Sequence, residues 1–76
     1  MNGIDEFVGI FREELIDSKL SGSTDFKNHN NWSSLTSLII ITEIEGKFGI
    51  FVDIESLRHS ETIEELYAGT ILVDSN

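Results

Sequence analysis

The chain contains no cysteine among its 76 residues. Disulfide bonds and thiolate metal sites are therefore excluded, and helix packing alone has to hold so small a core together. Its two histidines, His29 and His59, have no second ligand at the spacing of a metal site. We interpret each as a surface histidine, and we predict no metal site and no catalytic residue.

Basic residues are scarce, with 5 Lys and Arg against 14 Asp and Glu and a formal net charge of -9. A protein with this charge repels nucleic acid phosphates and anionic membrane surfaces. We therefore expect no nucleic acid partner, and we expect the proteins that bind this chain to offer basic surfaces.

Long apolar runs are also missing. The longest, Leu38 to Ile41, is far too short to span a bilayer, and the N-terminus has neither the basic region nor the apolar region of a signal peptide. We therefore expect no membrane insertion and a cytoplasmic protein.

Apolar residues nevertheless make up 39% of the chain and include 5 Phe, 1 Trp and 1 Tyr, which is enough for a packed core. A chain this short forms a single domain, residues 1–76, without room for an enzyme cleft. The adjacent acid pairs Glu13-Glu14 and Glu64-Glu65 point to different sides of a helix, so we interpret them as solvated faces. We predict that the protein is not an enzyme.

The first segment has the period of an amphipathic helix, because its apolar residues recur at steps of three and four. They are Ile4, Phe7, Val8, Phe11 and Leu15. Residues 18–33 lose this period and are rich in turn formers, which predicts a long loop. Phe26 and Leu20 are the apolar residues that could pin this loop onto a core.

A second helix is predicted to begin at Ser33 or Ser34, where a serine hydroxyl can accept a hydrogen bond from the first turn. Its expected apolar stripe is Leu35, Leu38, Ile41 or Thr42, Ile44 or Glu45, and Phe48. The run Leu38 to Ile41 also suits a strand, but the pattern is too long for one and stops at Gly49. Considered alone, Ser34 is a helix cap.

Two further helices complete an all-α fold. Asp53 is placed to cap a short helix that ends near Arg58, and the last helix is predicted to start at Ser60 or at Glu61-Thr62. The sequence thus predicts four helices, with a long loop after the first and a short third helix.

Several spacings around Ser34 belong to one pattern. Ser33-Ser34-Leu35 begins the second helix, Phe48-Gly49-Ile50 follows Ser34 by 14 residues, and Phe26 precedes it by 8. Trp32 lies two residues before Ser34, and Thr62-Ile63 begins the last helix. This pattern resembles the acyl carrier protein family, and the resemblance covers nearly the whole chain. It implies the family's four-helix bundle.

The resemblance further implies that Ser34 carries a covalent 4'-phosphopantetheine arm, which holds an acyl chain as a thioester. A phosphopantetheinyl transferase would attach the arm from coenzyme A, and acyl synthases or transferases with basic surfaces would act on the cargo. A phosphodiester on Ser34 would also be stabilised by the unpaired amides and dipole of the helix N-terminus. Of the rival hydroxyls, Ser33 breaks the spacing to Phe48 and Ser37 falls inside the helix.

The second helix is apolar on all sides near its start, so a small domain has to expose part of it. We expect this exposed face to bind partner enzymes through Leu35, Leu38, Ile39 and Glu43, and we expect the protein to be a monomer.

The sequence departs from the family at Ser33, where an aspartate that assists the transferase is usual. This favours a specialised lipid, polyketide or envelope pathway over general fatty acid biosynthesis. An unmodified protein-interaction module with the carrier fold remains the alternative.

Overall fold

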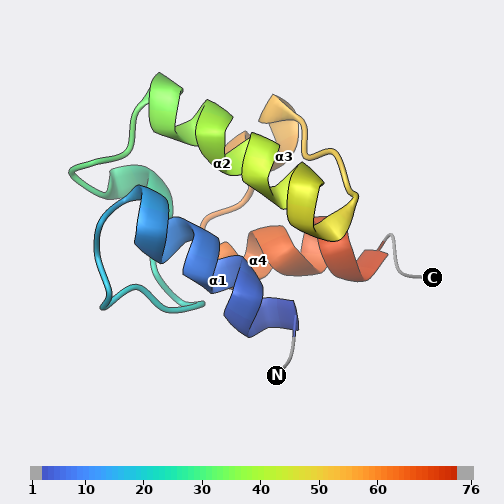
Figure 1. Ribbon diagram of the computed structural model, residues 1–76, viewed down its shortest axis with the longest axis horizontal. Coiled ribbons are helices and arrows are strands. Elements are labelled where there is room, and N and C mark those ends of the chain that lie inside the picture. Colours follow the sequence, from blue (N-terminus) through green and yellow to red (C-terminus); the bar gives the residue numbers. More distant parts are fainter. Residues whose placement is uncertain (1–2, 74–76) are drawn as a thin grey trace.

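The computed structural model describes residues 3–73 and shows helices joined by loops, with no strand in that range (Figure 1). Its elements are α1 (Gly3–Glu14), the 3-10 helix η1 (Phe26–Asn28), α2 (Ser34–Phe48), α3 (Ile54–His59), α4 (Ile63–Tyr67) and the π-helix η2 (Ala68–Leu72). Helix α1 packs against α2 and α4 and runs opposite to both, while α3 lies behind α2 in this view. The prediction of a small bundle of four helices is confirmed.

The apolar stripe of α1 forms the centre of the core. Phe7, Val8, Phe11 and Leu15 are buried as predicted, and Ile10 is buried with them. The ring of Phe7 lies 5.5 Å from that of Phe11, and it also meets the rings of Phe48 at 5.8 Å and Tyr67 at 5.2 Å. These edge and tilted contacts join α1, α2 and α4 in one aromatic cluster.

Helix α1 ends in a Schellman motif. The amide of Asp17 donates to the carbonyl of Arg12 at 3.0 Å, and the amide of Ile16 donates to that of Glu13 at 3.3 Å. This motif requires a left-handed residue, which is usually glycine, but here Ile16 occupies the position with φ 54°. A β-branched residue is strained in this conformation.

The long loop after α1 is ordered, as its apolar residues predicted, because Phe26 and Leu20 are both buried. Side chains also tie it to α1: Arg12 Nε donates to the carbonyl of Leu20 at 2.8 Å, and Asn31 Nδ2 donates to that of Leu15 at 2.7 Å. The loop also reaches α4, where the amide of Glu64 donates to the carbonyl of Gly22 at 2.8 Å.

Helix α2 is fixed at both ends by its caps. At the start, the Ser33 hydroxyl accepts from the amide of Thr36 at 3.1 Å, and Thr36 Oγ1 accepts from the amide of Ser33 at 2.8 Å. This reciprocal capping box makes Ser33 the cap, so the interpretation of Ser34 as the cap is wrong. At the end, Gly49 adopts a left-handed φ of 71°, which confirms it as the stop.

The predicted apolar stripe of α2 is right in its second half, where Ile41 and Ile44 are buried and Phe48 packs against the core, and wrong at its start. The buried face consists of Ser37, Ile40, Ile41 and Ile44. Leu35 and Leu38, which were expected in the stripe, are 68% and 59% exposed. A run that is apolar on all sides does not reveal which side faces the core.

The last two α-helices begin at the predicted caps. The Asp53 carboxylate accepts from the amide of Ser56 at 2.8 Å, and the Thr62 hydroxyl accepts from that of Glu65 at 3.2 Å. Within residues 3–73, no helix is both long enough and apolar enough to cross a membrane.

Candidate functional site

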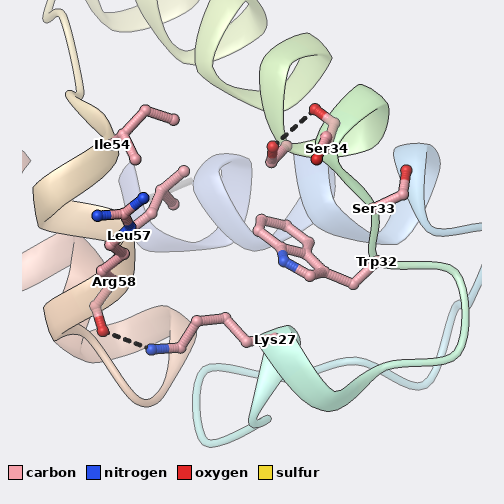
Figure 2. A pocket seen from close by; sticks show the side chains of 8 residues that line it. Lys27, Trp32, Ser33, Ser34, Ile54, Leu57 and Arg58 are labelled. Atoms are coloured by element: carbon pink, nitrogen blue, oxygen red, sulfur yellow. Dashed lines mark hydrogen bonds between the residues drawn. The ribbon is translucent and has the colours of Figure 1, made fainter.

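Ser34 is the first residue of α2 and is exposed. Its backbone carbonyl accepts a hydrogen bond from Ser37 Oγ at 2.8 Å, whereas its own hydroxyl has no hydrogen bond within residues 3–73 (Figure 2). The two nearby serines are not available in this way, because the Ser33 hydroxyl caps the helix and Ser37 is buried. Ser34 is therefore the one serine of the three whose hydroxyl the fold does not use.

A row of aromatic rings anchors the start of α2 to the core. The ring of Phe11 lies 5.3 Å from that of Phe26, and Phe26 lies 5.1 Å from Trp32, each pair meeting edge to face. Trp32 is half-buried, and its backbone amide donates to the carbonyl of His29 at 3.0 Å. These contacts fix the residue directly before the cap and thereby the position of Ser34.

Beside Ser34 the surface is hollowed between the long loop, the start of α2 and α3 (Figure 2). The hollow has a volume of about 330 Å³ and is lined by Lys27, Trp32, Ser33, Ser34, Ser37, Ile54, Leu57 and Arg58. In Figure 2, the residues of α3 form the wall opposite Ser34, and Trp32 lies between the two walls. A group attached to Ser34 would have this hollow directly next to it.

Sequence reasoning missed the half of the hollow that the loop and α3 contribute. Lys27 Nζ donates to the carbonyl of Arg58 at 2.7 Å, although the two residues are 31 positions apart. The only sequence signal was the proximity of Lys27 to Phe26, which was predicted to pin the loop. The contact between Lys27 and Arg58 forms only once the loop is folded against α3, so no local sequence pattern predicts it.

The four predicted partner-binding residues of α2 line one shallow groove but differ in exposure. Leu35 and Leu38 are strongly exposed and Ile39 is 37% exposed, and they form an apolar face that begins directly after Ser34 and continues into the next turn. Glu43 is half-buried, and its buried Oε2 atom has no hydrogen-bond partner within residues 3–73. The apolar face is open to solvent, whereas Glu43 is turned partly into the protein.

Glu43 faces acidic residues of α1. Carboxylate oxygens of Glu13, Glu14 and Glu43 all lie within 4.8 Å of one another, in contrast to the solvated faces predicted for the Glu13-Glu14 pair. Burial raises the pKa of Glu14, and the negative charge of Glu43 raises it further. This is the one group of carboxylates in the described residues that could jointly face a cation, and exposed acids commonly gather in this way without one.

The two histidines also differ from one another. The His29 side chain is only 16% exposed and bonds to Asp17, so its interpretation as a surface histidine is wrong. The His59 side chain is 82% exposed, as predicted, and lies 3.5 Å from a carboxylate oxygen of Glu55.

No protein-family model, no curated protein and no solved structure matches the chain.

Proposed function

We propose that this chain is an acyl carrier protein and that Ser34 carries its 4'-phosphopantetheine arm. The observation that carries the proposal is the exposed hydroxyl of Ser34, which has no hydrogen bond within residues 3–73 and lies next to a hollow. Because Ser33 performs the capping, Ser34 can be esterified without loss of a hydrogen bond that holds the helix. The protein would not be an enzyme, since the transferase and the acyl-handling enzymes supply the chemistry.

The attachment reaction is a phosphoryl transfer from coenzyme A. The Oγ atom of Ser34 forms a bond to the phosphorus that bears pantetheine, and the pyrophosphate bond of coenzyme A breaks. Adenosine 3',5'-bisphosphate leaves, a base of the transferase takes the hydroxyl proton, and magnesium on the transferase neutralises the phosphates. The new phosphodiester would lie at the N-terminus of α2, where free amides and the helix dipole favour a negative charge.

The arrangement of the helices supports the resemblance to the carrier family. Phe26, at its characteristic distance before Ser34, is fully buried against Phe11 and Trp32. Gly49, which follows Phe48, ends α2 in the left-handed conformation. Phe26 thus fills space in the core, and Gly49 supplies a backbone conformation that other residues adopt with strain.

Partner enzymes would bind the exposed apolar face formed by Leu35, Leu38 and Ile39. Such a patch beside a modified serine is suited to transient docking. The net charge of -9 would attract basic partner surfaces, so the association would weaken as salt is added. We propose that the protein works in the cytoplasm, where coenzyme A is available, and the cargo would belong to a specialised lipid, polyketide or envelope pathway.

The test is the intact mass of the purified protein after incubation with coenzyme A, magnesium and a broad-specificity phosphopantetheinyl transferase. We expect a gain of one phosphopantetheine, which peptide mapping locates on Ser34. Ser34→Ala should abolish the gain and leave the helical circular dichroism spectrum unchanged. Ser33→Ala is the matched control, since it removes a neighbouring hydroxyl and should still be modified. Modification of the Ser34→Ala variant would disprove the site.

An unmodified interaction module is the second candidate, and the serine at position 33 favours it, because the family's aspartate is absent there. This candidate predicts an unchanged mass with several transferases. It also predicts a partner that binds wild type and Ser34→Ala equally well but loses affinity when Leu38 is changed to glutamate.

A further inference from the structure

The ring of His29 contacts the protein through both of its nitrogens. Nε2 lies 2.9 Å from a carboxylate oxygen of Asp17, whereas Nδ1 accepts a hydrogen bond from the backbone amide of Asn31 at 3.0 Å. The side chain is only 16% exposed, so the ring has little room to turn away from either partner. The charge of the ring therefore decides which of the two contacts can exist.

The contact at Nδ1 requires a neutral ring. A histidine ring that gains a proton carries hydrogen on both nitrogens and no longer accepts a hydrogen bond at either. The new hydrogen on Nδ1 would point at the amide hydrogen of Asn31, and the two donors would repel one another. The contact at Nε2 has the opposite dependence, because a positive ring bonds more strongly to the carboxylate of Asp17.

Within residues 3–73, Asp17 is the one charged group, from any element, that pairs with His29. Its second carboxylate oxygen accepts from the amide of Lys19 at 2.9 Å, and the positive charge of Lys19 also acts on it. Other charged side chains of the adjoining segments bond elsewhere: Arg12 donates to the carbonyl of Leu20, Asp25 accepts from Asn28, and Lys27 donates to the carbonyl of Arg58. A protonated ring would therefore keep Asp17 as its partner.

Release of Asn31 costs less than release of Asp17. Asn31 is exposed, so water can accept its amide hydrogen once the ring no longer does. The side chain of Asp17 is 32% exposed, and a charge pair in such a half-buried place is stronger than one in open solvent. Protonation should therefore break the contact at Nδ1 and keep the contact at Nε2.

Asn31 is also joined to the start of α2. Its carbonyl accepts from Thr36 Oγ1 at 3.2 Å, and Thr36 is one half of the capping box of this helix. The next residue, Trp32, lies with its ring 5.1 Å from that of Phe26, and its amide donates to the carbonyl of His29 at 3.0 Å. A change at the Asn31 amide thus reaches the residues that hold the first turn of α2.

We propose that His29 is a pH-operated latch on the segment that leads into α2. The neutral ring holds the amide of Asn31, whereas the protonated ring keeps Asp17, releases Asn31 and loosens residues 30–32 beside Ser34. The proposal does not depend on the modification of Ser34, because every contact it uses lies within the unmodified chain. Histidine is the side chain whose charge changes between about pH 5 and pH 8, so the latch is tested in that range.

The first test is an NMR titration of the purified, unmodified chain from about pH 5 to pH 8. The ring signals of His29 report its protonation, and the amide signal of Asn31 reports the contact. We expect both to change with the same midpoint. Exchange of the Asn31 amide with solvent, corrected for its intrinsic pH dependence, should be about fivefold faster with the protonated ring, as loss of one ordinary hydrogen bond gives. The emission maximum of Trp32 should move to longer wavelength with that midpoint.

Two single substitutions assign the effect to His29. His29→Asn removes the titrating ring but leaves an amide oxygen close to the position of Nδ1, so the Trp32 emission should become independent of pH over this range. His59→Gln is the matched control, because it removes the other histidine, whose side chain is 82% exposed, and should leave the titration unchanged.

Three results would overturn the proposal. A His29 ring that titrates while the Asn31 amide stays unchanged would show that the segment does not follow the charge of the ring. A Trp32 shift that persists in His29→Asn would assign the effect to another group. A His29 ring that keeps one charge from pH 5 to pH 8 would leave no latch in this range. If His29→Asn does not fold, the midpoints of His29 and Asn31 in wild type still decide.

Discussion

The Nε2 atom of His29 lies 2.9 Å from a carboxylate oxygen of Asp17, and this pair fastens the long loop to the end of α1. The other ring nitrogen, Nδ1, accepts from the amide of Asn31 at 3.0 Å. A nitrogen that accepts carries no proton, so the neutral ring holds its hydrogen on Nε2 and donates it to Asp17. One side chain thereby bonds to the turn that follows α1 and to the segment that leads to the candidate site.

Asp17 should make stability depend on pH. The hydrogen bond from His29 and then the amide of Lys19 lower the pKa of this carboxyl below its ordinary value of 3.8. Its stabilising effect is therefore present above pH 3.8 and is lost as the pH falls through the lowered pKa. Asp17→Asn should lower the melting temperature at pH 7, and the gap to wild type should close below about pH 3.8.

The matched control for Asp17 is Glu45→Gln, since Glu45 is exposed and its side chain has no hydrogen bond or ion pair within residues 3–73. Its melting temperature should follow that of wild type across the same pH range. A gap for Asp17→Asn that stayed constant from pH 7 to pH 3 would contradict the role given to ionised Asp17.

Ionised Glu14 should lower the stability of the fold at neutral pH, in contrast to ionised Asp17, which raises it. Because burial and Glu43 raise its pKa above 4.5, its ionised form destabilises the folded state at neutral pH, and this cost disappears as the pH falls below 4.5. Glu14→Gln should raise the melting temperature at pH 7 and should change it little at pH 4. Glu6→Gln removes the same charge from the first turn of α1, about two turns away, and should give no such gain. Equal effects of both variants would show that net charge alone is responsible.

Ile16 is a position where a natural residue costs stability. Its left-handed conformation costs about 1 to 2 kcal/mol for an L-residue, and at 84% exposure the side chain buries little in return. Ile16→Gly should raise the free energy of unfolding by about 0.5 to 1 kcal/mol, once the added freedom of glycine in the unfolded chain is subtracted. Urea denaturation measures this, and Ile16→Val, which keeps the strain, should show no gain.

Phe26 should be among the most sensitive positions in the chain. It is fully buried, and loss of such a ring costs about 3 to 5 kcal/mol. A domain of this size has a total stability of roughly 3 to 5 kcal/mol, so Phe26→Ala should be largely unfolded by circular dichroism at 25 °C. Phe51, which is 68% exposed, is the control, and Phe51→Ala should change the free energy of unfolding by about 0.5 kcal/mol or less. A native melting curve for Phe26→Ala would contradict the role of this ring in ordering the loop.

The sequence was most informative where polar and apolar residues alternate clearly. The stripe of α1 and the caps at Asp53, Thr62 and Gly49 depend on local chemistry, so they could be predicted. The burial of Phe26 could also be predicted, because it is the large apolar residue in the middle of a polar segment. The core side of α2 could not, because Leu38 to Ile41 present apolar side chains in every direction.

The candidate site was predictable only in part. Ser34 and its exposed neighbours lie within a few residues of one another, so the spacing that resembles the carrier family could point to them. The wall formed by Lys27 and Arg58 depends on where the loop passes α3, and the proximity of Glu14 to Glu43 depends on how α1 crosses α2. Such contacts between distant residues arise from tertiary packing, so a local sequence pattern does not predict them.

The chain has a single tryptophan, and Trp32 stands between the two walls of the hollow with one side against Phe26. Its indole is half-buried between the core and the hollow, so its emission should respond to the polarity of the hollow, and the chain has no second tryptophan to mask the signal. The protein thus carries an intrinsic optical probe beside the proposed attachment site at Ser34. Loading, hydrolysis and transfer of a cargo could be followed in real time on the unlabelled protein.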